Sequence, residues 1–117
     1  MAASHLFMVR ANVAPEHEAA FNRWYDEEHV HDVARLPGCV RAARYRVLDD
    51  LPGDTSYRYL ALYEFESAAA LRQAVESPYF QELIRRFNDA WGAHTERVRA
   101  YYAQIYPPTD GGEQEAG

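Results

Sequence analysis

The sequence predicts an α+β fold in which helices cover one face of a single antiparallel sheet. The first observation behind this prediction is the order of elements along the chain: strand, helix, strand, strand, helix, strand. The second is size, since 117 residues, 48% of them hydrophobic, supply one continuous core and leave no room for another. We therefore expect one domain over residues 1–106 and a polar, disordered tail over residues 107–117.

The first half of the chain carries two predicted strands and the helix between them. Residues 5–13 are rich in β-branched and aromatic types, and this run ends at Pro15. Pro15 suits the first turn of a helix, which continues with helical spacing at Phe21, Trp24, Tyr25 and Glu28. We expect this helix to end or bend over residues 28–31. A Leu-Pro-Gly turn then leads into a second strand over residues 39–48.

A hairpin follows, with a polar loop over residues 49–56 and a third strand over residues 57–66. Because side chains alternate along a strand, one face of the third strand is aromatic and the other carries charges and leucines. The aromatic face contains Tyr57, Tyr59, Ala61, Tyr63 and Phe65.

The second helical region is divided by a proline. Ser67 can cap a helix over residues 68–76, and Ser77-Pro78 starts a second segment. That segment has an apolar stripe at helical spacing, formed by Phe80, Leu83, Ile84, Phe87 and Trp91. Residues 97–106 form the last predicted strand.

This order of elements is the ferredoxin-like β-α-β-β-α-β pattern, with helices on one face of the sheet. The other face is too apolar and aromatic to remain in water as one large patch. We therefore expect a second copy of the chain to cover it, which gives a homodimeric α+β barrel.

Charge and composition exclude several classes of function. The formal net charge is −6, which argues against a nucleic acid or an anionic membrane as partner. All twelve basic residues are arginines, so Schiff-base and pyridoxal phosphate chemistry on a lysine is excluded. The lone Cys39, the lack of a secretory signal and the lack of a long apolar run predict a cytoplasmic protein.

Three motifs carry a resemblance to a known family. They are Phe21-Asn22-Arg23-Trp24-Tyr25-Asp26-Glu27-Glu28-His29, Leu36-Pro37-Gly38-Cys39-Val40 and Ala43-Arg44-Tyr45. With the element order over residues 5–106, these motifs resemble the EthD-like branch of the dimeric α+β barrel superfamily. The family often has His-x-Pro after the helix, whereas this chain has His29-Val30-His31.

The resemblance implies a homodimer with a pocket between sheet and helices. It also implies a class that includes cofactor-independent dehydratases, cyclases, isomerases and monooxygenases acting on aromatic or polyketide-like compounds. Because the fold does not fix the reaction, the function must be argued from the site.

His29 is the first candidate for catalysis, since an imidazole both takes up and releases protons near neutral pH. Its alternative role is to cap carbonyl groups at a helix end. Asp32, three residues further along, either orients the His29 ring or is simply solvated.

The candidate substrate-binding residues are aromatic or cationic. Trp24 and Tyr25 can bind a planar carbonyl compound, although neighbouring helical residues point about 100° apart, and both can equally be core. Tyr63 and Tyr45 lie on strands predicted to pair and are further candidates. Arg44, beside the Pro-Gly turn, can anchor a carboxylate or an enolate.

We expect no metal site and no cofactor. His29, His31 and Asp32 are close in sequence, but helical positions two apart point in divergent directions, and no His-x-x-x-His or cysteine pair is present. Cys39 fits a small buried residue, and His5 and His94 fit the surface.

The leading hypothesis is a cofactor-independent lyase, dehydratase, cyclase or isomerase, in which His29 moves a proton on a hydrophobic, aromatic or polyketide-like carbonyl substrate. A second hypothesis is a cofactor-free monooxygenase of a phenolic substrate. A third, from a different class, is a non-catalytic ligand-binding or stress-associated barrel. Oxygen uptake separates the first two, and replacement of His29 separates both from the third.

Overall fold

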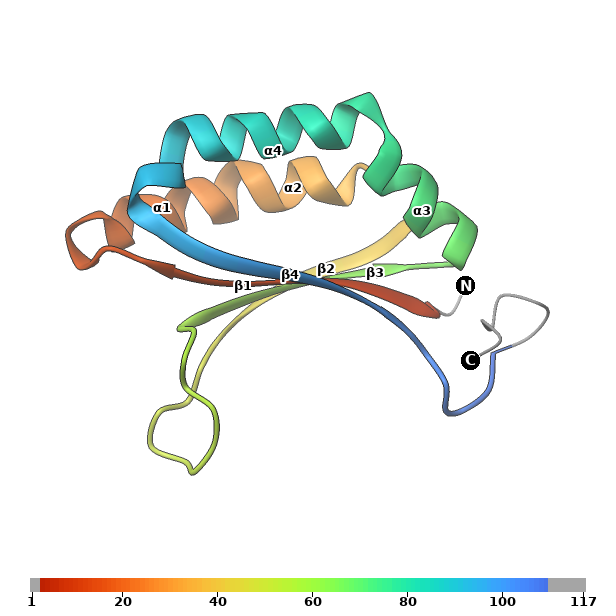
Figure 1. The fold of residues 1–117 in the computed structure, drawn as a ribbon, viewed down its shortest axis with the longest axis horizontal. Coiled ribbons are helices and arrows are strands. Elements are labelled where there is room, and N and C mark those ends of the chain that lie inside the picture. The colour runs from red at the N-terminus through yellow and green to blue at the C-terminus, as the bar shows by residue number, and fades with distance from the viewer. Residues whose placement is uncertain (1–2, 110–117) are drawn as a thin grey trace.

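A four-stranded antiparallel sheet forms the base of the molecule, and the helices lie on one of its faces (Figure 1). The computed structural model describes residues 3–109. The strand order is β2-β3-β1-β4, with every neighbouring pair antiparallel. This arrangement is the ferredoxin-like α+β fold that the element order predicts.

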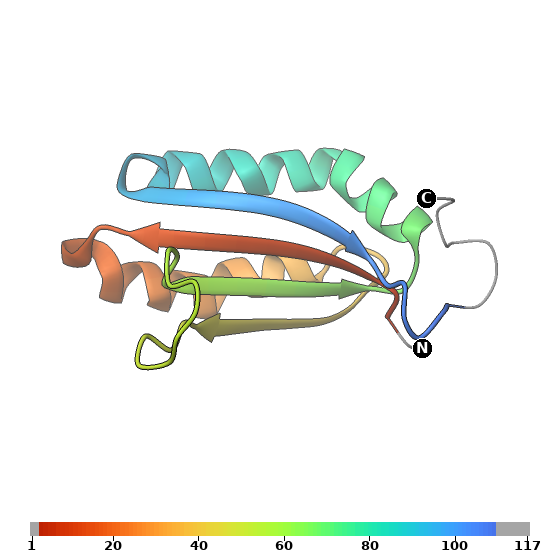
Figure 2. The ribbon, with the colours of Figure 1, turned by 60° about the horizontal axis from the view of Figure 1, so that its bottom comes forward.

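The strands are β1 (His5–Val13), β2 (Cys39–Arg46), β3 (Tyr59–Phe65) and β4 (Thr95–Ala103). Figure 2 shows β1 and β3 between the two outer strands. The predicted bounds of β1 hold, but β4 begins and ends earlier than predicted. Because Ala103 pairs with His5, the first residue of β1, the ladder has no partner strand beyond that point.

The first helical region is longer than predicted. A 3₁₀ turn (Pro15–His17) leads into α1 (Glu18–Trp24), a π-helical turn (Tyr25–His29) and α2 (Val30–Ala34). The helix therefore does not end at residues 28–31, the first of the two expected outcomes, because the π-helical turn passes into α2 there. Buried Val33, 3% exposed, extends the apolar face of the helix past that point, and Leu36, in the turn that follows, is 2% exposed.

The second helical region agrees with the prediction and consists of α3 (Ala68–Glu76) and α4 (Pro78–Trp91). The Ser67 hydroxyl accepts a hydrogen bond from the backbone N–H of Ala70 at 3.0 Å. Ser77 caps α4 in the same way, and Pro78 occupies its first turn. Ser67 thus begins the first helix, and Ser77 with Pro78 separates it from the second.

The core lies between the sheet and these helices. Alternate residues of β1 and β3 face it, which confirms the predicted aromatic face of the third strand. The buried strand residues are Phe7, Val9, Ala11, Ala61, Tyr63 and Phe65. The predicted stripe of α4 packs against them through Phe80, Leu83 and Phe87.

The opposite face of the sheet carries no helix. In Figure 1 the loop between β2 and β3 and the segment after β4 both turn away from the helices, so they flank this face. Within residues 3–109, no helix is long and apolar enough to cross a membrane. Residues 107–109 contain no helix or strand, and the rest of the predicted tail lies outside the described residues.

Candidate active site

The π-helical turn gathers Trp24, Tyr25 and His29 around one point on the helical face of the sheet. His29 is only 8% exposed, and the indole of Trp24 stacks on its ring at a centroid distance of 4.8 Å. In a regular α-helix, positions five apart point about 140° away from each other. The extra residue of the π turn brings Trp24 and His29 together. Tyr25 meets His29 edge to face at 4.9 Å.

Two buried tyrosine hydroxyls lie in the same pocket. The hydroxyls of Tyr25 and Tyr63 are hydrogen-bonded to each other at 3.2 Å. Burial raises the pKa of both phenols, so each keeps its proton at neutral pH. Because one hydrogen bond uses only one of their two protons, the pair retains one O–H that can be donated to a bound oxygen.

Arg97 on β4 adds a partly buried positive charge to the site. Its guanidinium lies 3.8 Å from the ring centre of Phe87 and donates a hydrogen bond to Asn88 Oδ1 at 3.0 Å. Among residues 3–109, no carboxylate forms an ion pair with it. Burial and neighbouring Arg99 lower the pKa of Arg97, which remains charged. The site thus contains a cation that no protein anion in this part of the chain balances.

The environment of His29 keeps its imidazole neutral. Burial is the largest cause, and the charges of Arg97 and Arg44 act in the same direction, so that the pKa falls to about 4. Asp32 opposes the shift without cancelling it. Neither ring nitrogen of His29 has a hydrogen-bond partner within residues 3–109. A neutral, unpartnered imidazole can accept a proton from a bound molecule.

The lowered pKa of His29 predicts that the stability of the fold decreases as the pH falls. The unfolded chain binds a proton at His29 more tightly, at pKa 6.5, than the folded chain does at about 4. Lowering the pH through this window therefore favours unfolding, while the native state keeps its full stability above it. We expect this residue to account for a loss of about 2.5 kcal/mol between about pH 7.5 and about pH 4.5.

Urea denaturation of the wild type and a His29→Phe variant at both pH values measures this loss. Phenylalanine keeps the stacking on Trp24 but cannot be protonated, and all other groups titrate equally in both proteins. The wild type should lose about 2.5 kcal/mol more than the variant. Equal losses in the two proteins would contradict the assigned environment of His29.

His29 lies between two hollows of different size. The inner pocket, between sheet and helices, has a volume of about 20 Å³, room for about one water molecule. His29, Tyr25, Tyr63 and Arg97 all line it. An aromatic molecule therefore enters only if its walls move apart.

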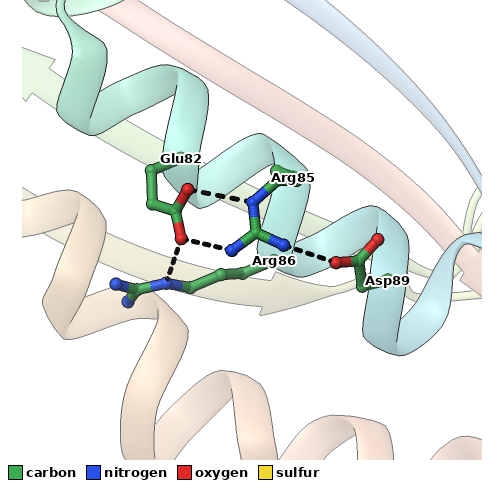
Figure 3. A network of polar contacts seen from close by, with 4 residues as sticks. All are labelled: Glu82, Arg85, Arg86 and Asp89. Atoms are coloured by element: carbon green, nitrogen blue, oxygen red, sulfur yellow. Dashed lines mark hydrogen bonds and ion pairs between the residues drawn. The ribbon is translucent and has the colours of Figure 1, made fainter.

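The outer groove runs between the π-helical turn and α4, and its volume is about 450 Å³. Trp24, His29 and Leu83 line it together with charged side chains. Figure 3 shows three of these charged lining residues on α4, Arg85, Arg86 and Asp89. Arg85 contacts Asp89 at 2.6 Å, and neighbouring Glu82 contacts both arginines. A charged groove thus leads from solvent to a buried imidazole.

Four of the predicted site residues do not line the inner pocket. One is Trp24, which lines the outer groove, and the others are Arg44, Asp32 and Tyr45. Arg44 is bound by its own neighbours, with hydrogen bonds to Asp26 at 2.8 Å and to Asn22 at 3.0 Å. Asp32 pairs with Arg35 and forms no hydrogen bond with His29. Tyr45 is 44% exposed on the face of the sheet opposite the helices.

Two site residues were missed by the sequence analysis, Phe87 and Arg97. Phe87 was identified only as part of an apolar stripe, yet its ring lies 5.5 Å from that of His29. Arg97 belongs to β4, where alternation places Arg97, Arg99 and Tyr101 on the helical face. The alternation of side chains along the last strand was the available signal.

The structure contains no evident metal-binding cluster among residues 3–109, since no three His, Cys, Asp or Glu side chains there are grouped to hold an ion. The nearest arrangement is the pair of His17 and His94, whose ring centres lie 4.0 Å apart.

Fold and site together define a ferredoxin-like α+β protein with a histidine-containing aromatic pocket beneath its helices. The chain belongs to the family described as "Domain of unknown function (DUF4286)", whose profile matches residues 4–104. No protein of curated function matches the sequence.

Several solved structures share the fold. An EthD family protein from Bacillus halodurans is 14% identical, with 82% of this chain and 96% of that chain covered and a TM-score of 0.63. HapK from Hahella chejuensis is 18% identical, with 92% and 99% covered and a TM-score of 0.64. SnoaB, a cofactor-independent oxygenase from Streptomyces nogalater, is 26% identical, with 91% and 99% covered and a TM-score of 0.56. The predicted resemblance to EthD-like proteins is thereby confirmed.

Proposed function

We propose that this protein is a cofactor-independent enzyme in which His29 takes a proton from an aromatic or polyketide-like carbonyl compound. The observation that carries the proposal is the pairing, in one pocket, of a neutral imidazole with a guanidinium that no carboxylate of residues 3–109 balances. Removal of a proton leaves an anion on the substrate. Arg97 is placed to stabilise that anion, and His29 is in the protonation state needed to create it.

The aromatic lining supports the substrate class. Phe7, Tyr25, Tyr63 and Phe80 form walls that suit a planar ring system, and the spare hydroxyl proton of the tyrosine pair suits its carbonyl oxygen. As the substrate becomes an enolate or phenolate, its oxygen gains charge beside both donors. The same charge raises the pKa of the His29 imidazolium that forms, because an anion now lies beside it.

The fate of the substrate anion decides the reaction class. Loss of a leaving group or return of the proton at another carbon makes the enzyme a lyase, cyclase or isomerase. Reaction with dioxygen instead makes it a monooxygenase, in which one oxygen atom enters the product and the other leaves as water. SnoaB, a cofactor-independent oxygenase, is 26% identical to this chain. This similarity makes the monooxygenase the alternative reaction to test.

We expect the purified protein to turn over members of a panel of two- and three-ring phenols and ring ketones with an acidic C–H. The panel is tested in air and without oxygen, with a metal chelator and no added flavin or nicotinamide. Substrate-dependent oxygen uptake identifies a monooxygenase, and anaerobic conversion identifies a lyase or isomerase. Binding of panel members without conversion, in the wild type and a His29→Ala variant alike, would instead support the ligand-binding alternative.

The open face of the sheet supports a homodimer. Leu6 and Met8 of β1, Leu60 and Leu62 of β3, and Val98, Ala100 and Tyr102 of β4 point away from the helices. Val98 and Tyr102 are 42% and 49% exposed in one chain. A second copy would cover this surface, with the flanking segments seen in Figure 1 reaching around it.

We expect the wild type to sediment as a dimer and a Leu62→Glu variant as a monomer. Leu62 pairs with Met8 in the middle of this face, so a carboxylate there would be buried without a partner on association. Gln73→Glu adds the same charge on an exposed position of α3 and should leave the dimer intact. Analytical ultracentrifugation of the three proteins decides, and a monomeric wild type would contradict the proposal.

A further inference from the structure

A third hollow lies at the other end of the helical face, beneath α3. Its volume is about 230 Å³, and its lining includes His5, Leu71, Val75, Tyr101 and Ala103. The stacked rings of Phe7 and Tyr101, 5.1 Å apart, lie between this hollow and the inner pocket, since Phe7 lines one and Tyr101 the other. We call it the His5 pocket.

His5 itself contradicts the expectation that it is a surface residue, because it is only 6% exposed. His5 is the first residue of the inner strand β1, and its side chain faces α3 at the edge of the core. Its Nε2 atom is buried and has no hydrogen-bond partner within residues 3–109. A buried polar atom without a partner costs stability and is uncommon in native proteins.

The hydrogen bonds of Ser4 determine whether His5 Nε2 is a donor or an acceptor. The Ser4 hydroxyl donates its proton to the carbonyl oxygen of Glu66 at 3.1 Å and also lies 2.7 Å from His5 Nδ1. Because a hydroxyl has one proton, Ser4 must accept the second hydrogen bond, and Nδ1 must donate it. In the neutral ring, Nε2 is then a bare acceptor. Further backbone hydrogen bonds to Phe65 and Gln104 hold Ser4 in place. This position of Ser4 favours the tautomer of His5 that carries its proton on Nδ1.

We propose that the His5 pocket is a second small-molecule site, which binds an apolar molecule bearing a hydroxyl or N–H group. That group is donated to His5 Nε2 once small shifts of the lining side chains uncover this buried atom. An apolar cavity of about 150 Å³ can hold benzene, so a pocket of 230 Å³ accommodates one substituted ring. Leu71, Val75 and the ring of Tyr101 contact the apolar body. This site uses none of the residues assigned to proton transfer.

The test compares p-cresol with 4-methylanisole, which has the same ring but lacks the hydroxyl proton. Titrations of the isotope-labelled full chain by NMR should shift signals of residues around the His5 pocket. We expect p-cresol to bind about fivefold more tightly than its methyl ether, the usual effect of one buried hydrogen bond.

Three variants locate the effect. His5→Leu should bind both ligands equally, and Val75→Phe, which fills the pocket from α3, should weaken both. His29→Phe should bind them as the wild type does, so failure of this proposal is distinguishable from failure of the proposed catalytic function. The proposal is overturned if the preference for p-cresol survives in His5→Leu, or if the shifts cluster around His29 in place of His5.

Discussion

Replacing His29 with phenylalanine is expected to lower kcat for the aromatic substrate by about 10²- to 10⁴-fold, the usual contribution of a positioned proton-transfer group. Phenylalanine keeps the stacking on Trp24 and the contact with Phe87, so KM should change little. A fall in kcat with an unchanged KM is the result expected when only the proton acceptor is lost.

His31→Ala is the matched control, because His31 lies on the same helix two residues away and is exposed. Its turnover should equal that of the wild type. A His29→Ala variant adds a further readout, since added imidazole can reach the vacated space through the outer groove and restore part of the rate. Turnover of His29→Phe within a few-fold of the wild type would show that another group takes the proton.

Replacing Gly38 with alanine is expected to destabilise the fold by about 3 kcal/mol. Gly38 has a φ of +88°, which L side chains rarely adopt, and it ends the turn between α2 and β2. A Cβ atom there would lie 2.4 Å from the Cβ of Ala70 on α3. The turn is fixed, since the carbonyl of Gly38 accepts a hydrogen bond from Glu66 N–H at 3.0 Å, and the start of α3 is fixed by the Ser67 cap.

Urea denaturation measures the effect, and two further variants separate its causes. Gly53→Ala lies in the β2–β3 loop with nothing within 4 Å of its added Cβ, and it should change stability little. Adding Ala70→Gly to Gly38→Ala removes the collision but not the backbone strain, so it should recover part of the loss. Equal stabilities of Gly38→Ala and Gly53→Ala would contradict the close approach of turn and helix.

The elements of the fold were predictable because each has a strong local signal. Alternation in residues 59–65, the capping serines Ser67 and Ser77, and the stripe of α4 each depend on residues near in sequence. The end of the first helix was not predictable in this way. The helix continues through Val33 because the sheet and α4 supply a core for this side chain to enter.

The candidate site likewise has a part that was predictable from local sequence and a part that was not. Trp24, Tyr25 and His29 come from one short segment, and their proximity could be expected, although the π turn that stacks Trp24 on His29 could not. Arg44 and Tyr45 were both candidates, yet neighbouring strand residues face opposite sides of a sheet. Arg44 does face the helices, but Asp26 and Asn22 occupy its guanidinium.

The sequence alone thus determined the ferredoxin-like order of elements, the aromatic face of the sheet and the grouping of Trp24, Tyr25 and His29 in one segment. Only the tertiary structure decided which charges surround that histidine. Arg97 approaches from the last strand and burial lowers the pKa of the imidazole, and both effects arise from the packing of segments far apart in the chain. The burial of His5 was decided in the same way, because exposure depends on what covers a residue as well as on its type.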